Sequence, residues 1–393
     1  MVDKAIDNLQ PAEVPSRSIP VADQCVLWAR AAGRCQFLGC NRPLWKSPVT
    51  QEPVNIAEKA HIYAFSPSGA RGNDGIERTE LNRVGNLMLV CHDCHRKMDQ
   101  AADGGRYTVE LLRSWKQQHE ERVELATGIS PEMGSRIVLY GANIGEYGSP
   151  LTYESTSGAL FPDRHPASDS VIELGSVDGM TRDHTPEFWA EEARNLEQRF
   201  ESRVRQPMAR GELGHLSVFA LAPQPLLIRL GMLLTDLVEV DVYQRHREPP
   251  TWRWLDDPPA DEIRVEEPDS TNGTPALVIA LSGTVADDRI KAALDGPVSI
   301  WRVTLDQPHN DWLRSRSQLE AFRQTVRALM DRIKAAHGQD AVLHVFPAAP
   351  VAVAVELGRI RQPKADLAWV VYDQHNKLGG FAPALDLRKD PTA

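Results

Sequence analysis

Two close pairs of cysteines constrain this chain more than any other feature of its sequence. The pairs are Cys35/Cys40 and Cys91/Cys94. The N-terminus lacks the basic-then-apolar pattern of an export signal, so we expect a cytoplasmic protein whose paired thiols bind metal rather than form disulfides. Four thiolates in two pairs suit Zn²⁺ in a closed, structural, tetrahedral site. A fifth cysteine, Cys25, is expected to be buried on a helix.

The chain is long enough for two or three domains. Its 393 residues are 42% hydrophobic and 25% charged, which excludes wholesale disorder. No apolar run approaches the 18 residues of a membrane span, so we expect no membrane partner. Residues 1–19 are predicted to be a flexible leader, and residues 127–169, rich in Gly, Ser and Pro, a linker with a few strands, such as 136–140. Two domains remain, over 20–126 and 170–393.

The N-terminal domain is predicted to consist of short elements separated by loops. Gly and Pro punctuate it, and few long apolar runs are present, so a bound metal would substitute for part of a missing core. The predicted helices cover 23–32, 93–99 and 109–125, and the strand-like segments cover 54–64 and 85–90.

Three residues between and beside the cysteine pairs are candidate catalytic residues. His61 follows a predicted strand, Asn86 opens the next strand, and His95 directly follows Cys94. This strand–loop–strand–helix order resembles the HNH, or ββα-metal, nuclease family over about residues 25–120. The resemblance implies that His61 is a general base, that Asn86 orients its imidazole, and that His95 holds a single divalent ion such as Mg²⁺.

The chain departs from the family pattern at one metal ligand. Family members often carry Asp directly before the first His, where this chain has Ala60. Glu58 lies on the same strand face as Ala60, because side chains alternate with a period of two, and is predicted to replace that Asp. His92 is an alternative ligand. The basic residues around the site either contact DNA phosphates or form an ordinary solvated surface; they are Arg71, Arg78, Arg83, Arg96 and Lys97.

The C-terminal domain alternates strand-like and helix-like segments, which predicts parallel sheets flanked by helices. The predicted strands are 216–222, 239–243, 276–281, 298–304, 341–346 and 367–372, and the predicted helices are 187–203, 225–237, 318–336 and 351–359. Segment 216–246 is echoed by segment 343–375: each reads as a strand, a Pro-flanked turn, a helix and a strand ending in Tyr. The repetition predicts two Rossmann-like halves, and hence a multi-domain α/β fold class.

These doubled units, following an HNH-like domain, resemble the SAVED sensor domain of HNH–SAVED effectors from bacterial CBASS antiphage systems. SAVED domains are similar to two fused CARF-like Rossmann halves. The resemblance implies that a cyclic di- or trinucleotide second messenger binds here. It also implies that the messenger switches on degradation of double-stranded DNA, which ends the infection together with the cell.

Turns at the carboxyl ends of the predicted strands are the candidate ligand site, because ligands of doubly wound sheets lie there. Helix starts in such turns receive phosphates, and aromatic or cationic side chains stack on bases. Trp252 and Trp254 equally fit simple packing under a Pro-rich loop. The candidate residues are Gln224, Tyr243, Arg245, Trp252, Trp254, Ser282, Gly283, Thr284, Pro347, Ala348 and Tyr372.

The net charge of −10 is distributed unevenly. Residues 20–126 hold 14 Lys and Arg against 13 Asp and Glu, and the rest of the chain holds 30 against 41. A nearly neutral nuclease domain would hold a polyanion poorly by itself, so we expect a homo-oligomer, a dimer that grows when the ligand binds. Two alternatives stay open: a modification-dependent HNH restriction endonuclease, and a non-catalytic, zinc-stabilised nucleotide sensor.

Overall fold

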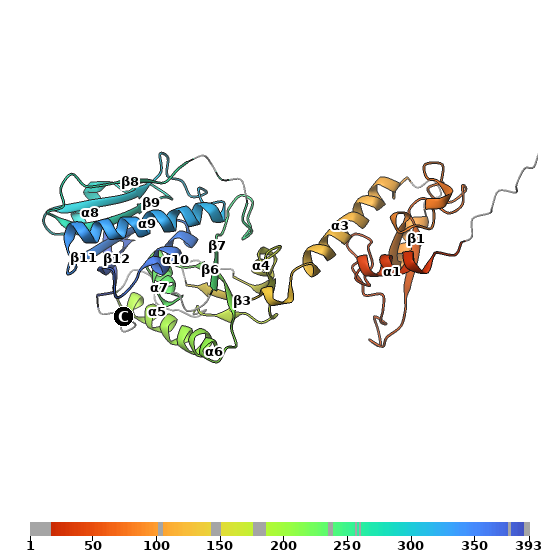
Figure 1. The fold of residues 1–393 in the computed structure, drawn as a ribbon, viewed down its shortest axis with the longest axis horizontal. Helices are drawn as coiled ribbons and strands as arrows, with labels where there is room; N and C mark the ends of the chain where they lie inside the picture. The colour runs from red at the N-terminus through yellow and green to blue at the C-terminus, as the bar shows by residue number, and fades with distance from the viewer. Residues whose placement is uncertain are drawn as a thin grey trace, which may run out of the picture. The chain divides into compact units, whose positions relative to one another are not determined.

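The protein divides into two compact units, residues 1–130 and 131–393 (Figure 1). The computed structural model describes residues 17–100, 105–142, 151–175, 186–234, 239–255, 258, 261–375 and 379–388. Most of the predicted leader, residues 1–16, therefore lies outside the described residues. Within the described part of the chain, no helix is both long enough and apolar enough to cross a bilayer.

The first unit is built on a two-stranded antiparallel sheet. Strand β1 (Ala57–His61) pairs with β2 (Leu87–Cys91), and His61 lies opposite Leu87. β2 is buried along its whole length, whereas β1 is buried only at Ala60. The helices are α1 (Val21–Arg30), α2 (His92–Asp99) and α3 (Val109–Thr127), with short 3₁₀ turns η1 (Arg78–Glu80) and η2 (Val84–Asn86).

The predicted strand–loop–strand–helix order is confirmed in this unit. α2 starts directly after β2, and α3 starts where the Thr108 hydroxyl accepts a hydrogen bond from the Leu111 amide at 3.2 Å. The expectation for Cys25 was wrong, because its side chain is exposed. α1 turns Asp23 and Leu27 toward the interior, and Cys25 lies on the other side of the helix.

The second unit contains two sheets, each with a parallel centre. The first sheet has the order β4-β3-β6-β7, with β5 also paired to β3, and all its pairs are parallel. Its strands are β3 (Gly134–Gly141), β4 (His165–Pro166), β5 (Ile172–Glu173), β6 (His215–Leu221) and β7 (Glu239–Tyr243).

The second sheet has the order β13-β12-β11-β9-β10-β8. Its four inner strands are parallel and its two edge strands are antiparallel to their neighbours. Its strands are β8 (Arg264–Glu266), β9 (Thr274–Ala280), β10 (Val298–Thr304), β11 (Val342–Ala348), β12 (Ala368–His375) and β13 (Gly380–Asp386). The predicted α/β class is therefore confirmed, and the two antiparallel edges are additions that the alternation did not indicate.

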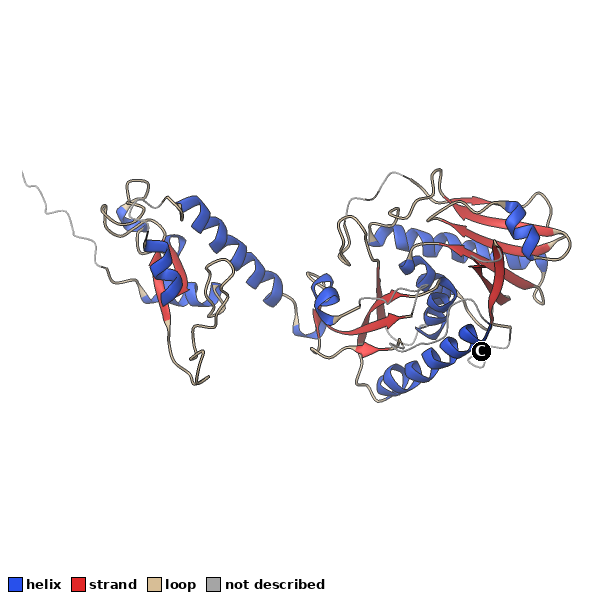
Figure 2. Cartoon of the chain, turned by 180° about the vertical axis from the view of Figure 1, so that it is seen from behind, coloured by secondary structure: helices blue, strands red, loops and turns tan. Residues whose placement is uncertain are grey.

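Helices cover these sheets and fill the space between them (Figure 2). A π-helical stretch, η5 (Glu201–Arg205), joins α5 to α6, and further 3₁₀ turns are η3 (Pro131–Met133) and η4 (Ser157–Ala159). The helices are α4 (Tyr153–Thr156), α5 (Pro186–Phe200), α6 (Gln206–Ala209), α7 (Gln224–Leu234), α8 (Asp287–Ala293), α9 (Arg316–His337) and α10 (Val351–Ile360).

The segment predicted as a linker with a few strands, residues 127–169, contains the strand expected at 136–140. β3 lies inside it and pairs in parallel with β6, from Arg136 opposite Leu216 to Gly141 opposite Leu221. The Gly, Ser and Pro residues that suggested a linker belong to the loops on either side of this strand. Residues 143–150 of the segment lie outside the described part of the chain.

The internal repeat of the sequence is present in the fold as two parallel strand–helix–strand units, β6–α7–β7 and β11–α10–β12. Helices α7 and α10 lie against each other between the sheets (Figure 1). A Cβ on Gly231 would come within 1.9 Å of the Val355 carbonyl oxygen, and one on Gly358 within 2.0 Å of the Ile228 oxygen. The two helices thus cross backbone to backbone, at equivalent glycines of the two repeats.

We predict that Gly231→Ala destabilises the second unit by about 3 kcal/mol, at the upper end of what overpacking a core costs, because a backbone carbonyl cannot move aside easily. Thermal unfolding of the full chain measures the change. Gly214→Ala is the matched control, since nothing lies within 4 Å of a Cβ there. Equal unfolding temperatures for the two variants would contradict the close crossing.

Candidate functional site

The four paired cysteines converge in the first unit. The sulfur atoms of Cys35, Cys40, Cys91 and Cys94 all lie within 4.8 Å of one another, and those of Cys40 and Cys91 are 3.9 Å apart. Cys91 ends β2 and Cys94 lies in the first turn of α2, so the strand-to-helix junction provides one pair. The loop between α1 and β1 provides the other. Four sulfur donors at this spacing fit a tetrahedral zinc ion.

Two thiols of this cluster, Cys35 and Cys94, need a cation to ionise, whereas the pKa of Cys40 lies below its ordinary value, because hydrogen bonds from the Arg42 amide and the neighbouring thiols outweigh its burial. Burial raises the pKa of the Cys35 thiol to about 12, and burial likewise raises the pKa of Cys94. A buried thiol with so high a pKa is neutral at physiological pH, whereas a bound Zn²⁺ displaces its proton. The cluster is thus a set of four donors that a metal would convert to thiolates.

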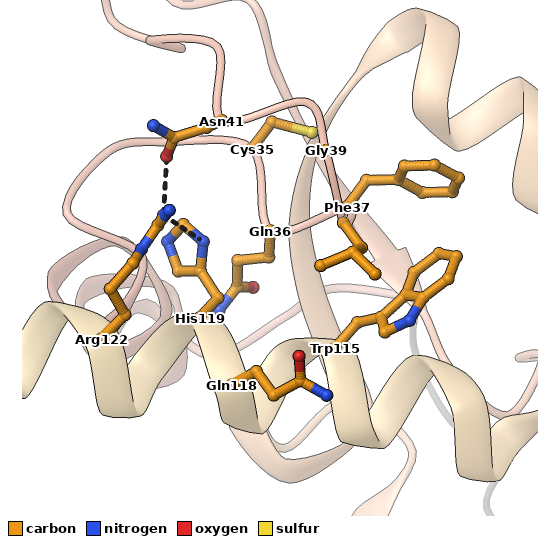
Figure 3. A pocket seen from close by; sticks show the side chains of 10 residues that line it. Cys35, Gln36, Phe37, Gly39, Asn41, Trp115, Gln118, His119 and Arg122 are labelled. Atoms are coloured by element: carbon orange, nitrogen blue, oxygen red, sulfur yellow. Dashed lines mark hydrogen bonds between the residues drawn. The ribbon is translucent and has the colours of Figure 1, made fainter. Parts of the chain in front are cut away.

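A cavity of about 150 Å³ separates the cysteine loop from α3 (Figure 3). Phe37 packs edge-on against Trp115 with ring centroids 4.8 Å apart. On the other side, Arg122 donates hydrogen bonds to Asn41 at 2.7 Å and to His119 at 3.2 Å. Cys35 is the one predicted site residue in its lining, so this cavity belongs to the packing of the cysteine loop rather than to the nuclease site.

His61 lies at the end of β1 with its imidazole held by an asparagine. Its Nε2 atom lies 2.9 Å from the Oδ1 atom of Asn82. The predicted partner, Asn86, does not contact the imidazole. Asn86 is buried, and its carboxamide accepts from the Tyr63 amide at 2.8 Å and donates to the carbonyls of Tyr63 and Leu81 at 3.1 and 3.0 Å.

The role predicted for Asn86 is therefore corrected. The side-chain amide of Asn86 forms its hydrogen bonds with two backbone segments, the loop after β1 and the segment before β2. Both segments pass close to this buried side chain. Asn82, four residues earlier, makes the imidazole contact. No motif spacing in the sequence distinguished Asn82, since many polar residues lie in the same loop.

His95 of α2 and Glu58 of β1 lie together. Glu58 sits between two imidazoles: its carboxylate contacts Nδ1 of His95, and its other oxygen lies 2.5 Å from Nδ1 of His92. The hydrogen bond from His92, and then that from His95, hold the pKa of Glu58 below its ordinary value. Asp99, one turn after His95, lies 3.3 Å from its Nε2 atom.

The side chains of this group are of the types that bind divalent cations. An ionised carboxylate and an imidazole from different elements, with a second carboxylate nearby, are donors that Mg²⁺ or Mn²⁺ accepts. Glu58 and His95, the two residues that the sequence analysis predicted for the cation, contact each other, and Asp99 lies beside His95 as a further carboxylate. The i, i+4 spacing of His95 and Asp99 on a predicted helix was the sequence signal for this addition.

Arg71 connects the two halves of this site. Its guanidinium donates to the carbonyls of His61 and Ile62 at 3.1 and 2.5 Å, to the Met98 carbonyl at 2.7 Å, and to the Asp99 carboxylate at 3.0 Å. Only 3% of its side chain is exposed. Arg71 is therefore neither a phosphate contact nor part of a solvated surface, but a clamp between the end of β1 and the end of α2.

In the second unit, several predicted ligand residues meet at the carboxyl ends of the strands. Gln224 accepts a hydrogen bond from the Ala349 amide at 3.1 Å, and the Ser282 amide donates to the Ala348 carbonyl at 2.8 Å. Gly283 and Thr284 follow Ser282 into the turn after β9. Pro347 and Ala348 end β11, and Pro347 is buried there.

Three of the predicted aromatic ligand residues are core residues instead. Tyr243 stacks on Phe219 with centroids 4.5 Å apart, and Trp252 meets the edge of the same ring at 5.3 Å. Tyr372 stacks on Phe346 at 4.4 Å. All three are buried. Their faces are filled by neighbouring rings, so they cannot also stack on a base.

Two other predicted ligand residues stay partly accessible. Arg245 lies over the Trp252 ring, 5.9 Å from its centroid. Trp254 lies beside His246, with ring centroids 6.1 Å apart, and packs against the main core. The structure therefore separates the predicted set into an accessible group at the strand ends and a buried aromatic group beneath it.

Two family models match this chain. Residues 35–102 match the HNH endonuclease model, and residues 196–387 match the model of SAVED, the SMODS-associated and fused to various effectors sensor domain. The chain joins an HNH domain to a SAVED domain. The HNH match contains all four clustered cysteines together with His61, Asn86 and His95, and the SAVED match contains every predicted ligand residue.

Solved structures of Cap4 SAVED/CARF-domain containing receptors also match. The receptor of Acinetobacter baumannii with the cyclic trinucleotide 2′3′3′-cAAA has a TM-score of 0.43 and 11% identity, over 71% of this chain and 56% of the receptor. The receptor of Moraxella osloensis has a TM-score of 0.39 and 12% identity, over 75% of this chain and 60% of the receptor. The chain thus spans less than two thirds of these receptors. No curated protein sequence matches it.

We predict that the HNH domain needs its metal to stay folded, because a two-stranded sheet and three helices bury little apolar surface. A strong chelator should remove zinc and make residues 17–130 sensitive to protease while the SAVED domain stays resistant. Cys35→Ser should have the same effect, and Cys25→Ser, at an exposed cysteine outside the cluster, should not. Full resistance of the zinc-free HNH domain would contradict the prediction.

We also predict that Arg71→Lys destabilises the HNH domain by about 2 kcal/mol, because lysine cannot make the four hydrogen bonds of the guanidinium and leaves buried carbonyls unpaired. Denaturant unfolding with a tryptophan signal measures the loss. Arg96→Lys is the control, because Arg96 is exposed on α2. If Arg71→Lys matched this control, the clamp would not contribute to stability.

Proposed function

We propose that this HNH–SAVED protein is a metal-dependent endonuclease for double-stranded DNA, switched on by a cyclic oligonucleotide in the cytoplasm as part of CBASS antiphage defence. One observation carries the proposal: a nuclease-type domain and a domain of the SAVED sensor family are joined in one chain. The geometry around His61, and around His95 with Glu58, supports the catalytic part of it.

Phosphodiester hydrolysis needs a base for the attacking water and compensation for charge that develops on the phosphate and the leaving oxygen. His61 is the base in this proposal, because its imidazole is partly accessible at the end of β1 and is oriented by Asn82. Arg71 fixes the distance between His61 and the α2 end of the site. A histidine acts well in this role because its ordinary pKa is close to neutral.

His95 and Glu58 would hold the catalytic cation, with Asp99 or His92 as further donors. When bound, a divalent cation neutralises charge on the phosphate and the leaving oxygen. The ionised state of Glu58, which its hydrogen bonds favour, suits this role. Zn²⁺ at the four cysteines would be structural, since four protein donors leave no open position.

The activating ligand would bind at the strand ends of the SAVED domain. The candidates that remain after the three buried aromatic residues are removed are Gln224, Arg245, Trp254, Ser282, Gly283, Thr284, Pro347 and Ala348. The accessible turns provide backbone amides and small residues that a phosphate can approach. A ligand activates the nuclease only if it binds the active state more tightly than the resting state. An assembly of several chains is one form that the active state could take.

Assembly would also compensate for the weak affinity for DNA that the nearly neutral charge of the HNH domain implies. Several such domains bound to one DNA would together have a higher affinity than a single domain, because the effective concentration of the second and later domains is high. We expect a dimer or larger homo-oligomer, and a larger one after ligand binding. Light scattering with and without the ligand measures this, and an unchanged mass would count against it.

The proposal is tested by incubating supercoiled plasmid with the full chain, Mg²⁺ and, in parallel, a panel of cyclic di- and trinucleotides. We expect cleavage only with Mg²⁺ and one class of cyclic nucleotide. Cleavage of modified DNA without any ligand would favour a modification-dependent restriction enzyme. Ligand binding without cleavage under any metal would favour a non-catalytic sensor.

We predict that His61→Ala lowers the cleavage rate by about 10²- to 10⁴-fold, the usual contribution of a general base. Zinc content, thermal unfolding and ligand binding should be unchanged, because His61 lies outside the cysteine cluster and the SAVED domain. Gel-based plasmid nicking gives the rate. Wild-type nicking by the variant would remove His61 from the mechanism.

A further inference from the structure

We infer that Asn82 is a positioning residue: its side-chain oxygen keeps the proton of neutral His61 on Nε2 and so presents Nδ1 as the base. The inference deepens the proposed function and rests on it, because it assigns the atom of His61 that accepts the proton from water. No motif match or family model assigns a role to Asn82.

The hydrogen bond between the two side chains decides the tautomer. Oδ1 of Asn82 is only an acceptor, and it lies 2.9 Å from Nε2 of His61, so Nε2 must carry the hydrogen. The orientation of the amide is set from its other end, since Nδ2 points to the Ser18 carbonyl at 3.4 Å, which is also only an acceptor. A flipped amide would place two oxygens against each other at Ser18.

The backbone on both sides of Asn82 is fixed. The Leu81 carbonyl accepts from the buried Asn86 amide at 3.0 Å. On the other side, Arg83 pairs with Asp23 of α1 at 3.2 Å, and the same carboxylate accepts from the Val84 amide at 3.0 Å. Asn82 is thus held between two anchored neighbours, and this explains how Asn86 can matter for His61 without touching it.

The other ring nitrogen of His61 is available. In the described part of the chain, Nδ1 of His61 has no hydrogen-bond partner, and the Phe65 ring lies edge-on to the imidazole at 5.7 Å. In the proton transfer, an O–H bond of water breaks and an Nδ1–H bond forms, while the electron pair stays on the hydroxide oxygen. That oxygen attacks phosphorus, and the leaving oxygen departs with the pair of the broken P–O bond.

The contact with Asn82 becomes stronger in this step. The imidazolium that forms carries a full charge, and its Nε2–H bond to Oδ1 is then charge-assisted. The same interaction is weaker while His61 is neutral. Asn82 therefore stabilises the product of proton transfer more than the resting state, as a positioning residue should.

Several cationic groups also surround His61, and every variant below keeps them. Lys59 lies on the same face of β1 and donates to Gln24 at 2.7 Å. Arg71 donates to the His61 carbonyl, and Arg17 lies over the Phe65 ring at 5.4 Å. Arg71 also pairs with the carboxylate of Asp99 at 3.0 Å. Differences between variants at residue 82 therefore report residue 82 alone.

The tautomer is measured directly by NMR on the full chain with ¹⁵N-labelled histidine, without DNA or ligand. We expect the His61 signal to show a protonated Nε2 and an unprotonated Nδ1. His61→Gln identifies that signal by its absence. A protonated Nδ1, or an even mixture of tautomers, would overturn the inference without using any activity.

The kinetic test compares three variants over a range of pH. Asn82→Asp keeps the acceptor and adds a negative charge beside the imidazolium, so the acid limb of the kcat profile should move up by about one pH unit. Asn82→Ala loses the acceptor, so kcat should fall by on the order of tenfold with KM unchanged. Asn55→Asp is the control: it adds the same charge near the start of β1, where Asn55 accepts from the Ala57 amide, and its profile should match the wild type.

Failure of this inference is distinguishable from failure of the proposed function. If the wild type cleaves DNA and His61→Ala does not, but Asn82→Asp keeps the wild-type pH profile, Asn82 does not act through His61. If the wild type itself shows no cleavage, the proposed function fails, and the NMR result still decides the tautomer. Zinc content and thermal unfolding of each variant show whether it has folded.

Discussion

The convergence of four sulfur atoms is the constraint on which the HNH domain depends. The loop that carries Cys35 and Cys40 is separated in sequence from Cys91 and Cys94 by the whole of β1 and the long loop after it. Bringing the pairs within 4.8 Å of one another fixes the start of α2 relative to the strands. His95 directly follows Cys94, so the orientation of one catalytic candidate is set by the metal cluster itself.

Periodic and paired features were predictable from the sequence because local chemistry determines them. The cysteine pairs, the strand–loop–strand–helix order and the repeated strand–helix–strand units all appear in the structure as expected. β7 and β10 have the predicted bounds, since each is a short segment rich in Val, Ile and aromatic residues. The strand of β3 was predicted inside a linker, because Gly and Pro residues surround it, and only its pairing with β6, distant in sequence, shows that it belongs to the sheet.

The roles of polar and aromatic residues were less predictable, because they depend on contacts distant in sequence. Tyr243 ends β7 as expected, whereas β12 continues three residues past Tyr372 to His375. Phe219 and Phe346 of the neighbouring strands cover the two tyrosine rings. The alternation of side chains along a strand predicts which face of the sheet a residue lies on. It does not predict which other residues cover that face. In the same way, Asn86 lies at the sequence position predicted for the asparagine of the HNH motif, but its side-chain amide forms hydrogen bonds with the backbone. Asn82 contacts His61 instead.

The two repeats of the SAVED domain are joined at their helices and at their strand ends, and this has a consequence for signalling. α7 and α10 cross with no room for a side chain at Gly231 or Gly358, so neither helix can slide without moving the other. Gln224 and Gln244 of the first repeat also hold the amides of Ala349 and Ala352 at the start of α10. A ligand at the strand ends would therefore contact residues of both repeats at once. Its binding energy would act on one connected body, and a shift between two packings of that body is the form in which a small ligand could alter another domain of the chain.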